Sequence, residues 1–366
     1  MEDTETAIKP ISALVKDLFE IGAVFRQGNY LVFSLFFRYE RDRSLRLLKD
    51  RLETAGYEYK LREGDSELLL SIDPTPQMRV PWLNVLFFVL TLLTVYFVPV
   101  FLRYGALAEG SGGMFRRTFE ALGAGAGLEF TVALMSILFV HEMGHFIASR
   151  RRNIVTSWPY FIPAPNLFGT FGAIIKSKSP FWNRRDLIEV GAAGPVFGWF
   201  VAVFWLCYGL LQSDVVAVSA FDNAYIPISM TGESILVRLL APAILGPAQP
   251  GYIYSFSEAA FAGWVGLLVT AINMLPIGQL DGGHVLYGLI RRRQHVLGKL
   301  ATAGLIVFGF QSAVWWLFAG FGLYFGMSHP PTLDDSRPPS RVAKTMGFAA
   351  LVILVISFAP APFGSG

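Results

Sequence analysis

The chain has 366 residues, of which 53% are hydrophobic and 16% are charged, and its mean hydropathy is +0.48. A soluble domain carries about 25% charged residues, so this composition excludes a wholly soluble protein. The net charge of +3 is small and the basic residues are spread over loops, which argues against a nucleic-acid partner. The one cysteine, Cys207, excludes a disulfide framework and a cysteine-based zinc ribbon.

Residues 1–78 differ in composition from the rest of the chain. Residues 29–40 are rich in aromatic and β-branched residues, which is typical of a strand, and residues 41–57 have a helical periodicity that ends at Gly56. Residues 57–74 predict two further strands around a Gly-Asp turn. We therefore expect a small soluble α+β domain at residues 1–78, followed by a membrane-embedded domain at residues 79–366.

Long apolar stretches dominate the second part of the chain. A membrane helix needs roughly 20 apolar residues, and such spans are predicted at 80–102, 123–149, 187–211, 259–280 and 345–362. Residues 298–328 form either one long tilted helix or a pair of short ones. The expected fold is an α-helical polytopic membrane protein with about six transmembrane helices, and a count of seven is left open.

Basic residues predict which side of the membrane each loop occupies, because cytosolic loops are enriched in Lys and Arg. The 213–257 connection holds only Arg238, which places it outside and the N-terminal domain in the cytosol. The basic loops are those after the second and fourth spans, with Arg150, Arg151, Arg152, Lys176, Lys178, Arg184, Arg185, Arg291, Arg292 and Arg293. Three later charges favour seven spans, since six would place them outside: Arg337, Arg341 and Lys344.

Residues 157–178 are too apolar for an ordinary loop and contain three prolines, at 159, 163 and 165. They end in the strand-like alternation GTFGAII at 169–175. Non-helical backbone is tolerated at membrane depth only where it is buried in protein or lines a watery cavity. The segment therefore predicts a re-entrant, strand-like excursion toward the interior of the helix bundle.

The second predicted span contains the sequence HEMGH, residues 141–145. In a helix His141 and His145 lie at i and i+4, so both imidazoles can reach one metal ion while Glu142 holds a water beside them. The alternative is that these residues are bundle-interior polar groups bonded to one another. Ionisable residues inside a membrane cost free energy and usually mark function, which favours the metal site.

Catalytic zinc takes three protein ligands and keeps one open position, so a third ligand must come from elsewhere. In residues 273–284, NMLPIGQLDGGH, Pro276 and Gly278 predict a helix break that lets Asp281 point into the bundle. Alternatively, Asp281 caps a helix at the cytosolic surface. The other histidines are weaker candidates, namely His284 as the one competitor and, with expected solvated roles, His295 and His329.

The two motifs together resemble the site-2 protease family of intramembrane zinc metalloproteases, whose patterns are HExxH and NxxPxxxxDG. Both match at every defining position, in the second predicted span and at the end of the fourth. Residues 169–175 and 191–199 are similar to other segments of that family, and the resemblance covers roughly residues 80–362. Gly198 departs from the family, where Asn is often found, so a polar contact of that helix is expected to be missing.

The resemblance implies a role for each matching residue. His141, His145 and Asp281 would bind one Zn²⁺ per chain, Glu142 would be the general base, and Asn273 would hydrogen-bond the substrate or its oxyanion. The implied enzyme is a multi-pass zinc endopeptidase with its active-site side toward the cytosol. It would cut in or near the transmembrane segment of a membrane-anchored, single-span protein, as in regulated intramembrane proteolysis. The expected surroundings are the lipid bilayer, and the oligomeric state is left open.

The strand-like segment fits the handling of such a substrate. A transmembrane helix hides its peptide bonds, so a protease must hold it extended, and pairing with an exposed strand edge does this. The candidate substrate-binding residues are Gly169, Thr170, Phe171 and Gly172, together with Asn273. The alternative is that residues 169–172 form a plain packing loop.

Two functions from other classes compete with the protease. A catalytically silent membrane scaffold would be expected to lack one of His141, Glu142 or Asp281, and all three are present. A metal transporter would carry acidic or histidine ligands on several spans along a path, whereas here they converge on two. The protease is therefore the preferred interpretation.

Overall fold

The computed structural model describes residues 2–27, 30–63, 68–72, 81–105, 111–152, 154, 156–177, 181, 183–217, 232–332, 335–336 and 338–363. The chain divides into two compact units, each considered by itself below. The first contains Met1–Trp82, Phe146–Trp158 and Ile175–Trp182, and the second contains Leu83–His145, Pro159–Ile174 and Asn183–Gly366. The predicted domain boundary between residues 78 and 79 lies outside the described residues.

The N-terminal part of the first unit is an α+β fold, as predicted. An antiparallel sheet in the order β1-β2-β4-β3 packs one face against two helices, burying Phe33 and Leu70 of the sheet with Leu52 of α2. The second helix ends at Gly56, which has the left-handed φ of 76° that glycine adopts at low cost. The elements are α1 (Glu2–Val15), β1 (Phe19–Gln27), β2 (Tyr30–Phe37), α2 (Arg41–Ala55), β3 (Tyr59–Glu63) and β4 (Leu68–Ile72).

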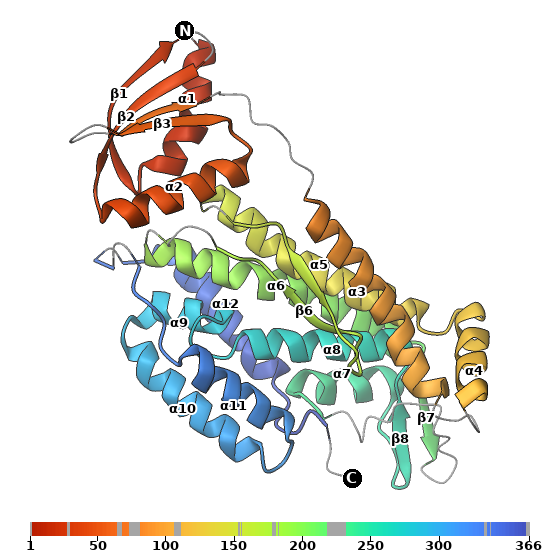
Figure 1. Ribbon diagram of the computed structural model, residues 1–366. Helices are drawn as coiled ribbons and strands as arrows, with labels where there is room; N and C mark the ends of the chain where they lie inside the picture. Colours follow the sequence, from red (N-terminus) through yellow and green to blue (C-terminus); the bar gives the residue numbers. More distant parts are fainter. Residues whose placement is uncertain are drawn as a thin grey trace. The chain divides into compact units, whose positions relative to one another are not determined.

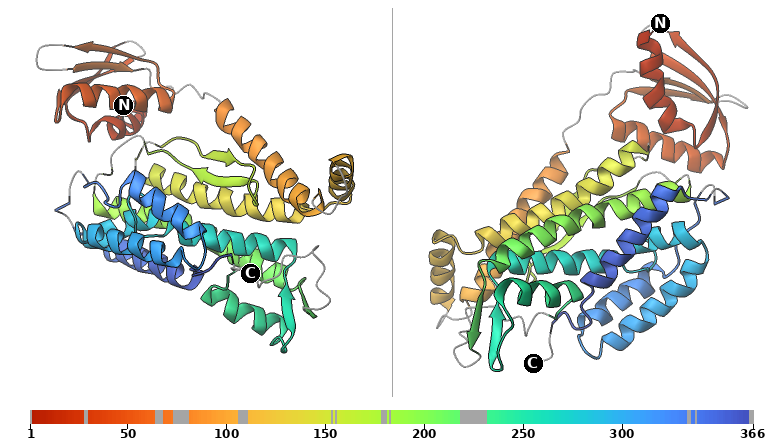
Figure 2. Two further views of the ribbon diagram at one scale, coloured as in Figure 1. Left: turned by 60° about the horizontal axis from the view of Figure 1, so that its bottom comes forward. Right: turned by 180° about the vertical axis from the view of Figure 1, so that it is seen from behind.

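The second unit is mostly helical. The elements that lie wholly or mostly in it are α3 (Trp82–Val100), the π-helical turn η1 (Phe101–Gly105), α4 (Ser111–Gly123), α5 (Leu128–Arg151), β5 (Tyr160–Pro163), β6 (Thr170–Ile174), α6 (Arg184–Leu210), β7 (Asp214–Ala217), α7 (Ile235–Leu245), β8 (Tyr252–Ser255), α8 (Glu258–Asn273), α9 (Asp281–Ile290), α10 (Arg293–Phe308), α11 (Val314–Phe325) and α12 (Arg341–Ser357). Figures 1 and 2 show α5, α6 and α8 running alongside one another, with α9 and α12 against α6. β5 pairs with β6 and β7 with β8, both antiparallel.

Within the described residues, three helical stretches are long and apolar enough to cross a membrane: Trp82–Gly105, Leu128–Arg151 and Arg184–Leu210. They correspond to the first three predicted spans. The count of six is not confirmed, because α8 has 16 residues and ends at Asn273, short of the predicted end at residue 280. Residues 298–328 are a pair of helices, α10 and α11, rather than one long helix.

Helix α6 lies at the centre of the second unit and packs closely on α8. At Gly263 of α8 a Cβ would overlap the backbone nitrogen of Leu206, so the two helix backbones touch directly. Without a hydrophobic driving force between helices in lipid, such close approach through small residues is a main source of association. The helix that supplies Asn273 is therefore held against α6 by backbone contact.

Glu258 ties the start of α8 to the start of α5. Both of its carboxylate oxygens accept from the backbone N–H of Gly127, at 2.8 and 3.0 Å, just before α5 begins. Hydrogen bonds to charged groups contribute about 1.5 to 3 kcal/mol.

We expect Glu258→Ala to lower the free energy of unfolding of the second unit by about this amount, measured by chemical unfolding of the full chain in detergent. The control is Glu233→Ala, because Glu233 is half exposed and its ion pair with Arg238 spans 3.4 Å. Equal stability of Glu258→Ala and the wild type would contradict the prediction.

Candidate metal centre

One turn of α5 presents the two histidines and the glutamate of HEMGH to the protein interior. His141, Glu142 and His145 are all buried, with exposed fractions of 3%, 5% and 9%. The i, i+4 spacing of the histidines places their ring centroids 5.0 Å apart. Gly144 faces α6 so closely that a Cβ there would come within 2.8 Å of the carbonyl oxygen of Ala193. The helix thus carries its polar residues inward against a neighbouring helix.

The third candidate ligand reaches this turn from the break between α8 and α9. Helix α8 ends at Asn273, and the chain turns through residues 274–280 before α9 begins at Asp281. Pro276 and Gly278, which has a φ of 51°, lie inside this turn, as the sequence predicts. Asp281 starts a helix rather than ending one, which excludes the helix-ending cap considered as an alternative.

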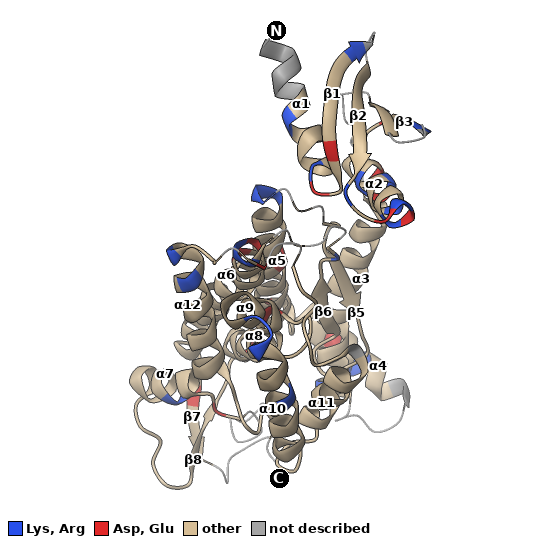
Figure 3. Ribbon diagram, turned by 90° about the vertical axis from the view of Figure 1, so that its left-hand side faces the viewer, with Lys and Arg blue, Asp and Glu red and all other residues tan. Residues whose placement is uncertain are grey.

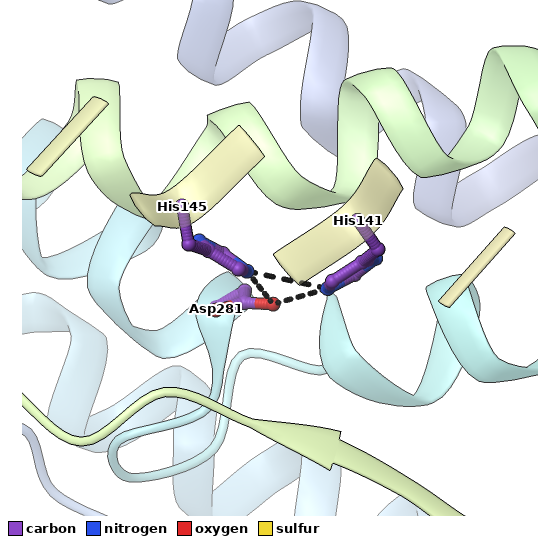
Figure 4. Close-up of side chains that lie close together, drawn as sticks. All are labelled: His141, His145 and Asp281. Carbon is purple, nitrogen blue, oxygen red and sulfur yellow. Dashed lines mark hydrogen bonds and ion pairs between the residues drawn. The ribbon is translucent and has the colours of Figure 1, made fainter. Parts of the chain in front are cut away.

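Three donor atoms, one each from His141, His145 and Asp281, lie close enough together to bind one metal ion (Figure 4). Nε2 of His145 lies 3.2 Å from Nε2 of His141 and 3.2 Å from Oδ2 of Asp281, and Nε2 of His141 lies 3.4 Å from the same oxygen. Each ring nitrogen carries at most one proton, and that proton can point toward only one acceptor. Hydrogen bonds among these groups therefore cannot satisfy all three edges of the triangle, whereas an ion above its centre contacts all three atoms.

The triangle fits zinc. Zn–N and Zn–O bonds are about 2.0 to 2.2 Å long in tetrahedral sites, so two ligands of one zinc lie about 3.3 to 3.5 Å apart. The observed separations of 3.2 to 3.4 Å match that edge. Two imidazoles with one carboxylate are also a donor set that catalytic zinc uses, with the fourth position left open.

A hydrogen bond from α6 fixes which nitrogen of His145 faces the other donors. Nδ1 of His145 lies 2.9 Å from the carbonyl oxygen of Val190. A carbonyl can only accept, so Nδ1 carries a proton and Nε2 is the nitrogen left to bind a metal ion. This second contact orients the ring in the way that partners of metal-binding histidines usually do.

Comparison with known proteins identifies the family of this chain. Residues 129–315, slightly more than half of the chain, match the profile of Peptidase family M50. The chain belongs to peptidase family M50. This membership confirms the resemblance to site-2 proteases that the two motifs gave.

Several curated proteins resemble this M50 chain. It is 33% identical over 243 residues to the "Probable zinc metalloprotease EGY1, chloroplastic" of Arabidopsis thaliana, which is 64% of this chain and 43% of that protein. It is also 30% identical over 245 residues to the "Probable zinc metalloprotease EGY2, chloroplastic" of Oryza sativa subsp. indica. This alignment covers 65% of this chain and 43% of that protein. It thus spans less than half the length of these relatives. No solved structure matches it.

Helix α6 forms one wall of the M50 site through glycines that face its histidines. A Cβ at Gly194 would overlap Nε2 of His145, and a Cβ at Gly198 would lie 2.9 Å from Nδ1 of His141. Sequence reasoning noted residues 191–199 only as a family-like segment and missed this role. The spacing of Gly191, Gly194 and Gly198, which places all three on one helix face, was the signal available. Gly198, noted as a departure from the family, leaves room for the ring of His141.

Asn273 and Glu142 both lie at the M50 site. The amide nitrogen Nδ2 of Asn273 is 3.3 Å from Nε2 of His141, so the end of α8 reaches the donor triangle. Glu142 is next to His141 in sequence and interacts electrostatically with all three donors. The structure thus brings together five of the predicted residues, and their individual roles stay predictions.

The contacts described for residues 169–172 are with α3, with β5 and within the hairpin itself, and not with the three donor atoms. A Cβ at Gly169, where φ is 75°, would overlap the backbone of Val95 in α3. The hydroxyl of Thr170 donates to the carbonyl of Ile162 in β5 and accepts from the N–H of Gly172. Phe171 is 71% exposed. This part of the M50 chain is a hairpin, as the strand-like pattern predicts, and substrate binding there stays a prediction.

The prediction that His329 is solvated is wrong. Its side chain is 4% exposed, and its Nε2 lies 2.6 Å from Nδ1 of His284 in α9. His295 is half-buried and lies 3.1 Å, through Nε2, from the carbonyl oxygen of His329. The polar sequence around these histidines hid the contact, because the segment that follows α11 folds back over α9 in the M50 domain.

Proposed function

We propose that this M50 chain is a zinc-dependent intramembrane endopeptidase. Its substrate would be a membrane-anchored protein with a single span, cut in or near that span as in regulated intramembrane proteolysis. The observation that carries the proposal is the triangle of His141, His145 and Asp281, whose edges suit one zinc ion. The helix that supplies both histidines is also one of the three candidate membrane spans.

The residues divide the hydrolysis between them. His141, His145 and Asp281 would hold zinc, which when bound supplies a Lewis acid that favours nucleophilic water and polarises a scissile carbonyl. Glu142, buried beside the histidines, would take a proton from the attacking water and pass it to the leaving amine. The side-chain amide of Asn273 would donate to the carbonyl oxygen of the scissile bond as negative charge builds on it.

The β5–β6 hairpin supports the proposed handling of an extended substrate. Each of its two strands pairs with one other strand, so each has one edge without a strand partner among the described residues. Phe171 and Ile174 of β6 are 71% and 55% exposed, which leaves apolar side chains available to a substrate. In Figure 4 a strand in the yellow-green of this hairpin crosses the field below the three donors. Residues 169–172 would therefore receive the unwound substrate segment by strand addition.

The distribution of basic residues supports a cytosolic position for one end of the bundle. Figure 3 shows Lys and Arg at the starts of α6 and α12. A Cβ at Gly347 of α12 would lie 3.2 Å from Ile188 of α6 and 3.3 Å from Leu289 of α9, so these ends are neighbours. Because α10 and α11 form a pair, the chain returns to that end before α12. Arg341 and Lys344 would then lie with the other basic residues on the proposed cytosolic side, which supports seven spans over six.

Metal removal tests the proposal. We expect the purified full chain to contain one zinc per chain and to cleave a single-span test substrate in detergent or liposomes. A strong chelator should abolish cleavage, and stoichiometric zinc should restore it, because three protein ligands leave zinc exchangeable but required.

The alternatives give different results in the same experiment. A silent scaffold would hold zinc without cleaving the substrate. A transporter would move zinc across the liposome membrane, which a fluorescent zinc indicator inside the liposomes detects. Cleavage that persists after zinc has been removed, verified by elemental analysis, would exclude the proposed chemistry.

A further inference from the structure

The loop that carries Asp281 depends on a segment that comes later in the chain. Residues 274–280 join α8 to α9, and the N–H of Gly278 in this loop donates to the carbonyl oxygen of Met327, at 3.2 Å. A Cβ at Gly278 would overlap the carbonyl oxygen of Gly326. The loop therefore rests directly on the backbone that follows α11. We call residues Gly326–Thr332 the strap.

Gln294 joins the strap to the loop. Its side chain is fully buried at the start of α10, and its Nε2 donates to the carbonyl oxygens of Pro276, at 3.0 Å, and Met327, at 3.2 Å. Its Oε1 accepts from the N–H of His329, at 3.0 Å. Pro276 lies in the helix break, where its carbonyl has lost the regular helical pattern. One amide thus satisfies backbone groups on both sides of the contact.

A second connection runs from the strap to α9. Nδ1 of His329 faces the carbonyl oxygen of Pro330, which can only accept, so that nitrogen carries the proton. Burial lowers the pKa of His329 to about 4, so the ring is neutral at pH 7. Its Nε2 then accepts from Nδ1 of His284, 2.6 Å away. His284 lies one helical turn beyond Asp281 on α9.

We propose that Gln294 and His329 are positioning residues for Asp281, acting through the strap to fix the third ligand at the metal centre. Gln294 holds the loop through Pro276, and His329 holds the first turn of α9 through His284. Asp281 lies between these two points, where the loop becomes the helix. This inference rests on the proposed function, because it assigns the strap to the same zinc site.

The chemistry of Gln294 makes the role specific to its amide. Glutamate has the same shape, but an ionised carboxylate would direct an acceptor at the carbonyl oxygens of Pro276 and Met327, where the amide donates. We therefore expect Gln294→Glu to release the strap without creating a cavity. His329→Ala removes the other connection.

The test measures zinc affinity by chelator competition and the absorption spectrum of the cobalt-substituted full chain. Gln294→Glu and His329→Ala should each weaken zinc binding on the order of 10-fold, as changes to outer partners of metal ligands do. Both should shift the cobalt bands, because the carboxylate of Asp281 moves. The matched control is Thr302→Val, also buried in α10, whose hydroxyl donates to Gly298 within its own helix. It should change neither measurement.

The outcomes distinguish a failure of the strap proposal from a failure of the proposed protease function. Wild-type zinc affinity and an unchanged cobalt spectrum in both strap variants would overturn the proposal, even if the wild type cleaves its substrate. An equal loss in Thr302→Val, with an equal drop in the unfolding temperature of the metal-free chain, would also overturn it. A wild type that binds zinc without cleaving the substrate counts against the proposed protease. The strap proposal is still tested in that case, by the zinc affinities of the two strap variants.

Discussion

Glu142→Gln is expected to lower the rate of substrate hydrolysis by about 100- to 10,000-fold, the usual contribution of a general acid–base group. Glutamine has nearly the same shape as glutamate, so the packing of α5 should persist. Its amide cannot accept the proton of the attacking water at neutral pH. Since Glu142 supplies none of the three atoms that form the donor triangle, the variant should keep one zinc per chain.

The measurement is single-turnover cleavage of a single-span substrate by matched amounts of zinc-loaded protein, with elemental analysis of each preparation. The control is Glu129→Gln, which makes the same change in the first turn of the same helix. It should leave the cleavage rate unchanged. Zinc retention together with wild-type cleavage in Glu142→Gln would contradict the assignment of this residue.

Gly194→Ala is expected to destroy the metal centre without changing any ligand. A Cβ at this position of α6 would overlap Nε2 of His145, the atom that points at the other two donors. Either the ring rotates away, breaking its bond to Val190, or α6 separates from α5. Both changes displace a ligand by more than the tolerance of a tetrahedral site, so we expect zinc affinity to fall by at least about 100-fold, with loss of cleavage.

Gly304→Ala provides the matched control for this substitution. Gly304 lies inside α10, and a Cβ there would meet no atom within 4 Å. Alanine stabilises a helix interior relative to glycine by up to about 1 kcal/mol, so this variant should be at least as stable as the wild type. Stoichiometric zinc in Gly194→Ala, measured by elemental analysis after dialysis, would show that the site does not need the glycine.

The candidate site could be predicted largely because its chemistry is local in sequence. His141 and His145 share a helix face through their spacing alone, and Pro276 with Gly278 indicates the break before Asp281. The contacts that orient these groups were not predictable in the same way. Val190 lies 45 positions from His145, and their contact depends on which faces of two helices meet. Nothing in a single helix pattern specifies that choice.

The fold was predicted less completely than the site. Hydropathy identified the three long spans, but it carried the fourth past Pro276, since the apolar sequence continues beyond the helix end at Asn273. Helix α1 and strand β1 were not predicted, and Pro10 inside α1 interrupts its helical pattern. Gln294 gave no signal because a lone glutamine in a basic stretch is typical of a solvated helix end. Its burial follows from the later segment that covers it.

The wide separation of the donors along the chain has a consequence for biosynthesis. His145 and Asp281 are 136 positions apart, and the strap follows Asp281 by more than 40 further residues. A nascent chain that has inserted α5 and α6 holds both histidines but only two thirds of the ligand set. The proposed cleavage activity would then require that α9 has been made and has docked against α6. Chains that end before α9 would lack the third ligand and with it the proposed activity toward neighbouring membrane proteins.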